Sequence, residues 1–359
     1  MSFDAFLQDK SSQFIVLQKT RDDWLKSWMS TASPYENKTH TGDIIVENGT
    51  YSIENMEFHL LGKMSVRNDA TVIARNAKLV LLPGYAVELE NKSKFVAENA
   101  TIFFQPSIGP SYIVVDHESQ LNITDSRLSG WGGIIARHDS KMYIENGTLE
   151  GPNPRDRENC GVITEVNSFA SIQNSKLDSA FARGQSSILV MESIIQPNGV
   201  SAIENGTIEI ENSDVGYCQG LLENSNLRIS NSTVEGISFG GSVLQVRDSQ
   251  INGLWASVNC SATLIGTSVS YVKAHGNSTI WLINSVVREI KTWDEAKVHV
   301  GWQLPVLGVL TVPYTWIPIL KVVFVIAILI VIIAAAVLIN KRWKRWQTEK
   351  MKQEAMSAR

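Results

Sequence analysis

Apolar and polar residues alternate in short stretches that recur at nearly constant spacing along most of the chain. In one clear copy, apolar Leu227 and Ile229 stand two apart between the polar corners Asn224 and Asn231, and apolar Val234 follows. An apolar period of two is typical of a β-strand with one face in the core and one in solvent. The pattern therefore predicts a series of short strands joined by polar corners.

Twelve copies align on the residue that ends this strand, which is usually Asn or Asp. These anchor residues are Asn55, Asn76, Asn99, Asp125, Asn146, Asn174, Glu192, Asn212, Asn231, Asp248, Gly266 and Asn284. They lie on average about 21 residues apart, and repeats of this length are typical of stacked coils that bury their apolar faces only together. Asn and Gly suit such corners because both tolerate a positive φ.

Two columns of this alignment are expected to face the core. The residue two positions before each anchor is apolar, and so is the residue three positions after it. A further apolar run, often after Gly, precedes many copies, as in 133–135, 161–163 and 220–222. We therefore expect an all-β fold, a parallel β-helix with three short strands in each of about twelve coils over residues 34–295.

This repeat resembles the right-handed parallel β-helix family, the pectin-lyase-like solenoids, and among them the membrane-anchored forms common on archaeal cell surfaces. The resemblance covers residues 42–295 and implies a right-handed solenoid. It implies no single activity, because this scaffold carries lyases, hydrolases, adhesins and structural proteins alike.

The two ends of the chain differ from the repeat. Residues 1–33 contain no apolar run as long as that of a signal peptide, which leaves the export route open, and their amphipathic pattern predicts a helix that caps the first coil. Residues 296–317 form a juxtamembrane segment that either closes the last coil or lies against the membrane. Residues 318–340 then predict a transmembrane helix, and 341–359 form a basic tail.

The transmembrane prediction rests on an uninterrupted apolar run. Val322–Ile339 holds 18 apolar residues, a length typical of a membrane-spanning helix. Lys341, Arg342, Lys344 and Arg345 follow it at once. Because positive charge stays on the cytoplasmic side, we expect a cytoplasmic tail in contact with membrane lipid and an extracellular solenoid.

Charge and sequons fit that placement. The net charge of −4 and the lack of a basic stripe argue against a nucleic-acid partner. Ten Asn-X-Ser/Thr sequons occur, and we expect N-glycosylation best at Asn37, Asn91 and Asn122, outside the anchor columns, and also at Asn48, Asn205 and Asn277. The alternative is that Asn side chains in the columns turn inward and bond to one another from coil to coil.

The three cysteines form no CxxC pair, so no structural metal site is expected. Cys160, Cys218 and Cys260 are interpreted as free thiols, mostly buried. Asp116 lies in a stretch that resembles the calcium-binding strand of pectate lyases, and with Glu118 and Asp139 it could form an acidic cluster that binds calcium. These three acids are the weak catalytic candidates. The second motif of that family is missing, and the alternative is a set of unrelated surface acids.

Two stretched repeats suggest a second kind of site. The intervals 99–125 and 146–174 are the longest, and extra loops on a solenoid often form its binding face. The weak ligand-binding candidates there form a sugar-binding ledge of aromatic and charged side chains: Tyr112, Trp131, Arg155, Asp156, Arg157 and Glu158.

Three hypotheses about function follow. The first is a non-catalytic, membrane-anchored surface solenoid for envelope structure, adhesion or contact with glycans or envelope proteins, with no cofactor. The second is a tethered polysaccharide lyase or hydrolase, which would need three or more carboxylates beside a Lys or Arg. The third is the exterior subunit of a membrane transporter complex.

Overall fold

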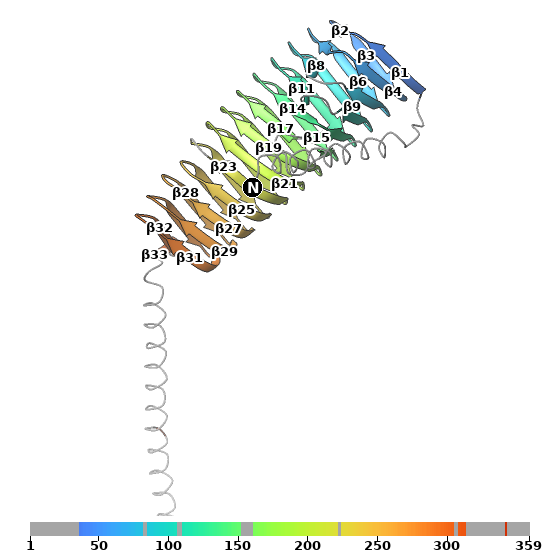
Figure 1. Ribbon diagram of the computed structural model, residues 1–359. Helices are drawn as coiled ribbons and strands as arrows, with labels where there is room; N and C mark the ends of the chain where they lie inside the picture. The colour runs from blue at the N-terminus through green and yellow to red at the C-terminus, as the bar shows by residue number, and fades with distance from the viewer. Residues whose placement is uncertain are drawn as a thin grey trace, which may run out of the picture.

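The computed structural model describes residues 36–81, 85–105, 110–151, 161–221, 224–304, 308–313 and 342. Over this range the chain forms a parallel β-solenoid of about twelve turns, all-β and of the right-handed type. Figure 1 shows the coils stacked in chain order from β1 at one end to β33 at the other.

One wall of the solenoid, sheet B, takes one strand from every coil. Each strand pairs in parallel with the equivalent strand of the next coil, except that the last strand turns back antiparallel on its predecessor. In order the strands are β3 (Thr50–Glu54), β6 (Thr71–Arg75), β9 (Lys94–Glu98), β12 (Gln120–Thr124), β15 (Lys141–Glu145), β18 (Phe169–Gln173), β20 (Ser187–Met191), β22 (Thr207–Glu211), β24 (Asn226–Ser230), β26 (Val243–Arg247), β28 (Ser261–Ile265), β30 (Thr279–Ile283), β32 (Lys297–Leu304) and β33 (Gly308–Pro313).

The other wall, sheet A, begins as two separate rows of strands. The first row is β1 (Glu36–Thr41), β4 (Met56–Leu61), β7 (Lys78–Leu81), β10 (Thr101–Phe104), β13 (Arg127–Gly130) and β16 (Thr148–Glu150). The second row is β2 (Ile44–Val46), β5 (Met64–Val66), β8 (Tyr85–Leu89), β11 (Ser111–Val115), β14 (Gly132–Ala136) and β17 (Gly161–Glu165).

The two rows merge at β19 (Lys176–Arg183), which pairs with both β16 and β17. From there each coil contributes one long strand to sheet A. These strands are β21 (Ile194–Ile203), β23 (Asp214–Leu221), β25 (Thr233–Phe239), β27 (Gln250–Ala256), β29 (Ser268–Ala274) and β31 (Val286–Thr292). The prediction of three strands in every coil is thus correct for the first coils and wrong for the later ones, which have two.

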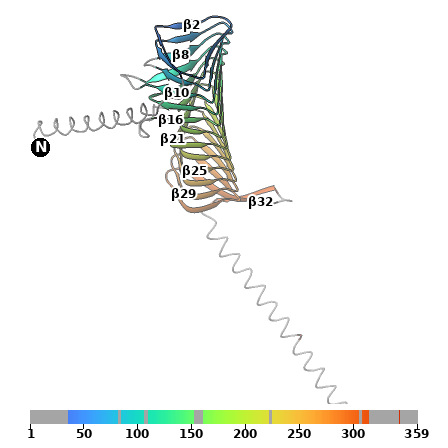
Figure 2. The same cartoon turned by 90° about the vertical axis from the view of Figure 1, so that its right-hand side faces the viewer.

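The anchors and the core are where the sequence pattern predicts them. All twelve anchor residues have a positive φ, between 46° for Asn76 and 62° for Gly266. The core column two positions before the anchors, from Ile53 to Leu282, is at most 2% exposed. Figure 2 shows these coils from the side, with the strands of each sheet stacked along the axis.

Buried hydroxyls line the corner just inside the anchors. The Ser213 hydroxyl donates to the Glu211 carbonyl (2.7 Å) and accepts the backbone N–H of Ser193 on the preceding coil (3.1 Å). The same two bonds recur at Ser175, Ser193, Ser232 and Ser249. The hydroxyls therefore satisfy buried backbone groups that the tight corner leaves without a strand partner.

The ends of the solenoid are described only in part. The predicted juxtamembrane segment contributes β32, which pairs with β30 of the last coil, and β33, which pairs with β32. The predicted capping helix at 1–33 and the transmembrane helix at 318–340 lie outside the described residues, as does the tail apart from Arg342. No helix among the described residues has the length and apolar character needed to cross a membrane.

Candidate functional site

A column of tyrosines and small residues runs along the outer face of sheet A. Tyr112 lies opposite Gly133 on the next coil, and Gly161, Ser179 and Gly199 follow on the coils after that. The column continues through Tyr217, Gly236, Gly253 and Tyr271. We call these nine residues the tyrosine column.

The small residues of the tyrosine column are required by the close approach of neighbouring coils. A Cβ atom on Gly133 would stand 2.7 Å from the carbonyl oxygen of Gly161, and one on Gly199 would stand 1.8 Å from that of Tyr217. Gly199 also has a φ of 73°. No side chain therefore fits at these positions without moving the backbone, and the surface above them is hollow.

That hollow is a groove of about 590 Å³, which we call the Tyr112 groove. Its lining mixes apolar side chains with amides and hydroxyls: Tyr112, Ile163, Ser179, Phe181, Asn198, Ser201 and Gln219, with Gly133, Gly161, Gly199, Ala180 and Val200 as its floor. Aromatic and apolar walls with a few convergent polar groups are typical of ligand sites.

Asn198 carries a polar group that the described residues leave unsatisfied. Its side-chain Nδ2 is buried and has no hydrogen-bond partner there. A buried amide donor without an acceptor costs about 1–3 kcal/mol, and because this atom is out of reach of solvent, a ligand oxygen would meet it only after the Asn198 side chain rotates. Asn198 therefore marks the polar part of the Tyr112 groove.

Beyond the groove the tyrosine column forms an aromatic platform. Tyr217, Trp255 and Tyr271 cover Gly236 and Gly253, with the ring centroids of Trp255 and Tyr271 4.9 Å apart. Burial, with a smaller contribution from the phenol of Tyr217, raises the pKa of Tyr271. The two phenols thus lie near each other above the glycines, and Tyr217 remains 40% exposed.

The predicted sugar-binding ledge is only partly described. Tyr112 and Trp131 are half-buried, and Tyr112 lines the groove. Arg155, Asp156, Arg157 and Glu158 lie outside the described residues, so the charged part of the ledge stays a prediction. Phe181 and Asn198 come from later coils, and neither they nor the glycines of the floor are among the predicted residues.

The three acidic candidates do not form one metal-binding group in the described structure. The carboxylate of Asp116 contacts His138 (Oδ1 to Nδ1, 2.6 Å) and His117 (3.2 Å). Glu118 points to Lys92, with 3.6 Å between carboxylate and ammonium, and Asp139 joins no such group. The arrangement lacks the several oxygen ligands that calcium requires.

A second acidic pair lies beside the stretched loop. Asp178 is 8% exposed, and its carboxylate accepts the backbone N–H of Gly151 (2.6 Å). Burial raises the pKa of Asp178 to about 6, whereas a hydrogen bond from Lys176 lowers the pKa of Glu150. The Gly151 bond gives Asp178 a structural role, because it fixes the backbone directly after β16.

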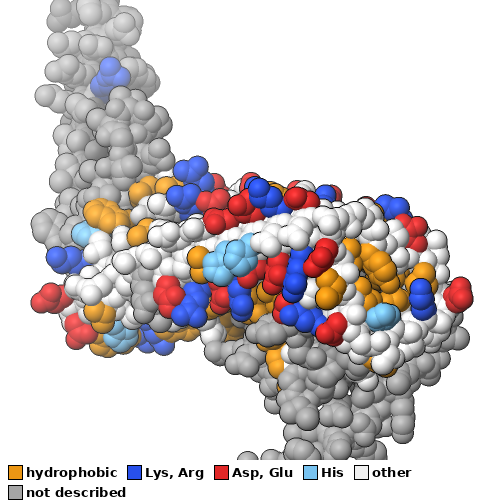
Figure 3. Space-filling model, turned by 90° about the horizontal axis from the view of Figure 1, so that it is seen from above, with side chains coloured by type: hydrophobic (Ala, Val, Ile, Leu, Met, Phe, Trp, Pro, Cys, Tyr) orange, Lys and Arg blue, Asp and Glu red, His pale blue; other side chains and the backbone are white. Residues whose placement is uncertain are grey.

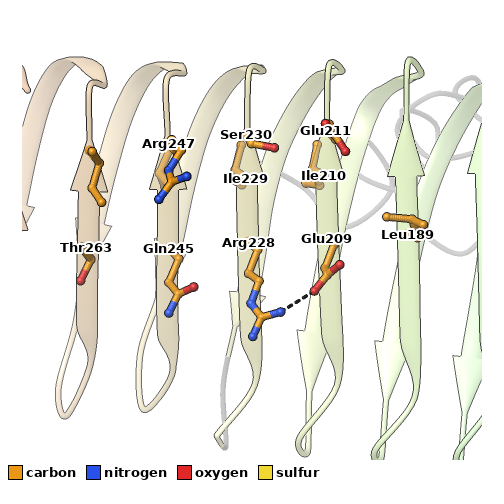
Figure 4. A pocket seen from close by; sticks show the side chains of 12 residues that line it. Leu189, Glu209, Ile210, Glu211, Arg228, Ile229, Ser230, Gln245, Arg247 and Thr263 are labelled. Atoms are coloured by element: carbon orange, nitrogen blue, oxygen red, sulfur yellow. Dashed lines mark hydrogen bonds and ion pairs between the residues drawn. The ribbon is translucent and has the colours of Figure 1, made fainter.

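Sheet B carries a shallower, more polar groove of about 510 Å³. Figure 4 shows Glu209 and Arg228 facing each other across neighbouring strands (2.6 Å), with Gln245 and Thr263 following on the next two coils. No aromatic side chain lines it. Acidic and basic side chains also mix over the surface seen in Figure 3, and such exposed pairs contribute little stability.

The sequon asparagines lie on the outside of the solenoid. Nine of the ten are exposed, among them Asn37, Asn48, Asn91, Asn205 and Asn277. Asn122 is half-buried and accepts a hydrogen bond from Gln120 (2.8 Å). Bonds between coils do occur, as from Asn99 to Asn76 (2.8 Å), but they run along the surface rather than inside.

The two described cysteines fit the prediction of free, buried thiols. Cys218 and Cys260 are free and buried. Burial raises the pKa of both thiols, that of Cys260 to about 11. Cys160 lies outside the described residues. Neither described thiol has the exposure or the lowered pKa of a reactive cysteine.

Comparison of the chain with protein-family models, with curated proteins and with solved structures gives no significant match. The parallel β-solenoid agrees with the predicted β-helix fold, while the pectin-lyase-like and archaeal parts of the resemblance stay predictions.

Proposed function

We propose that this protein is a non-catalytic surface receptor that binds an extended glycan in the Tyr112 groove, and that a C-terminal helix holds it outside the membrane. The observation that carries the proposal is the groove itself, in which aromatic walls and amides, the unsatisfied Asn198 among them, lie over a floor made mainly of glycine. Sugar rings offer matching chemistry, with apolar faces for aromatic stacking and hydroxyls for hydrogen bonds.

The length of the groove favours a chain-like ligand over a single sugar. Strands of a sheet lie about 4.8 Å apart, so the five coil steps from Tyr112 to Tyr217 span about 24 Å. Tyr217 and Trp255 then extend the aromatic surface in the same direction. An oligosaccharide of several rings would lie along the solenoid axis and contact a new strand at each step.

The arrangement of the acids supports binding over catalysis. Among the described residues, the sole group of three potential metal ligands is Asp116, His117 and His138, and it contains one carboxylate. A calcium-dependent lyase needs several carboxylates on one ion and a base beside the substrate. Two features support an extracellular position of the solenoid, the apolar run Val322–Ile339 and the exposed sequon asparagines.

Binding can be tested by calorimetry with defined hexasaccharides, both neutral (cello- and chito-oligomers) and acidic (oligogalacturonate). We expect Tyr112→Ala to weaken binding of the recognised hexamer by about tenfold, which corresponds to about 1.4 kcal/mol. Tyr143→Ala is the matched control because Tyr143 is exposed on sheet B. We expect that variant to bind within about twofold of the unmodified chain.

Three results would overturn the proposal. These are no binding of any hexamer at millimolar concentration, equal effects of Tyr112→Ala and Tyr143→Ala, or cleavage of the oligosaccharide during the titration. On intact cells that display the full chain, external protease should abolish capture of the fluorescently labelled hexamer. Capture that survives protease would contradict the extracellular placement.

A further inference from the structure

We propose that Asp116, His117 and His138 form a binding site for a divalent transition-metal ion such as Zn²⁺. One ligand atom from each of the three side chains lies within 4.8 Å of the other two. The site is separate from the Tyr112 groove and independent of the proposed function, and no calcium chemistry is involved.

The fold brings the three residues together from two neighbouring coils. Asp116 and His117 follow β11, and His138 follows β14, which pairs with β11 in register. The backbone N–H of Glu118 donates to the carbonyl of His138 (3.1 Å), so the two corners are themselves hydrogen-bonded. Both histidines have a left-handed backbone, with φ of 49° and 44°. The imidazoles are therefore positioned by rigid corners rather than by a flexible loop.

Asp116 already contacts both histidine rings, and its contact with His138 is a hydrogen bond that an ion would replace. Oδ1 of Asp116 lies 2.6 Å from Nδ1 of His138 and 3.2 Å from Nδ1 of His117. Tetrahedral Zn²⁺ binds nitrogen and oxygen at about 2.0–2.2 Å, which puts neighbouring ligand atoms about 3.3 Å apart. The imidazole rings are stacked with centroids 5.1 Å apart. Small rotations of the exposed histidine side chains would open room for one ion.

The carboxylate is held in place before any ion arrives. Its Oδ1 accepts the backbone N–H of His117 (2.9 Å), and the Asp116 side chain is 19% exposed. Such a supporting bond orients a metal ligand and lowers the cost of assembling the site. The nearby charges are already paired, Glu118 with Lys92 and Arg137 with Glu165. Apart from the two histidines themselves, no cation among the described residues therefore has to be displaced from Asp116.

The ligand set selects the kind of ion. Imidazole suits Zn²⁺, Cu²⁺ and Ni²⁺, whereas Ca²⁺ and Mg²⁺ prefer carboxylate and carbonyl oxygens. Three protein ligands leave at least one position on a tetrahedral ion for solvent or an outside group. Because His117 and His138 are exposed, that position faces outward, where a ligand group on another molecule could fill it.

The test is titration of the full-length, chelator-treated protein with Zn²⁺ by calorimetry and with Cu²⁺ by electron paramagnetic resonance. We expect one ion per chain and nitrogen coupling from two imidazoles, with no binding of Ca²⁺. His117→Asn and His138→Asn should each weaken Zn²⁺ binding at least tenfold and reduce the coupling to one nitrogen. Asn68 and Asn91 hold the equivalent left-handed corner on earlier coils, so these variants should keep the fold.

His275→Asn is the control, since His275 is an exposed corner histidine that stacks on Trp293 and belongs to no such group. It should bind Zn²⁺ as the unmodified chain does. Equal affinity in all variants, or no saturable binding, would overturn the site. Tyr112→Ala should leave Zn²⁺ binding unchanged, so failure of the metal site and failure of the glycan groove are distinguishable.

Discussion

Backbone conformation is the main demand that this fold makes on single residues. Every coil turns through corners with positive φ, and most of these positions hold Asn, Asp or Gly, whose small or hydrogen-bonding side chains tolerate that conformation. Val166 is an exception, because it is β-branched and yet has a φ of 46° at 46% exposure. The equivalent corner on the preceding coils is occupied by Asn68, Asn91, His117 and His138.

Val166→Asn should therefore stabilise the protein. A β-branched residue in the left-handed region costs about 1–2 kcal/mol, and the exposed valine gives little packing in return. We expect the free energy of unfolding in urea to rise by about 1 kcal/mol, at an unchanged dependence on denaturant. Val258→Asn is the control, because Val258 is 56% exposed but lacks a positive φ. A gain of the same size in that variant would show that strain is not the cause.

At the scale of elements, the buried corner hydroxyls of Ser175, Ser193, Ser213, Ser232 and Ser249 join one coil to the next. Removal of the Ser213 hydroxyl leaves the backbone N–H of Ser193 without its acceptor inside the solenoid. Ser213→Ala should lower the free energy of unfolding by about 1–3 kcal/mol, the cost of an unsatisfied buried donor.

Thermal and urea unfolding would measure this loss, with Ser238→Ala on the exposed face of β25 as the control. Slow hydrogen exchange at Ser193 in the unmodified protein should become faster in the Ser213 variant. A loss no larger than that of Ser238→Ala would mean that water replaces the hydroxyl without cost.

The elements could be predicted from the sequence where local pattern decides them. Strand alternation and corner chemistry are properties of about seven consecutive residues, and the anchors and the core column were located correctly from them. The merging of two strand rows at β19 was missed. The signal was present, because the intervals shorten to 17–20 residues in the later coils and leave no residues for a separate corner.

The Tyr112 groove was harder to predict because its residues come from six coils. In most of the later coils the column residue stands five residues after the anchor, as at Tyr217, Gly236 and Gly253, but Gly199 stands seven after Glu192. In the earlier coils insertions lengthen the stretch between the anchor and the column residue, so Gly133 and Gly161 do not stand at this offset. Which residues meet on the surface there depends on strand pairing, which the repeat alone does not specify.

For the molecule as a whole, stability is expected to be a sum over coils and their neighbours. Deletion of residues 231–247 removes one complete repeat and joins Ser230 directly to the next anchor, Asp248. The remaining strands can pair in their original register. We expect a folded protein that loses about 1–3 kcal/mol, in proportion to the residues removed.

Deletion of 231–239 alone is the control for that experiment, because it removes β25 and leaves β26 without its coil. We expect this half-repeat deletion to abolish cooperative thermal unfolding followed by circular dichroism. Cooperative unfolding in both proteins, or in neither, would contradict a coil-by-coil architecture.

The tyrosine column gives this architecture a further property. Since backbone hydrogen bonds set the spacing between coils, the column presents one residue to a ligand about every 4.8 Å along the solenoid axis. The glycine positions of the column are fixed by the close backbone approach, whereas Tyr112, Ser179, Tyr217 and Tyr271 carry side chains that can be exchanged. A change of specificity would therefore need exchanges only at the positions that already carry side chains, whereas a change in the length of the recognised ligand would need a coil to be gained or lost.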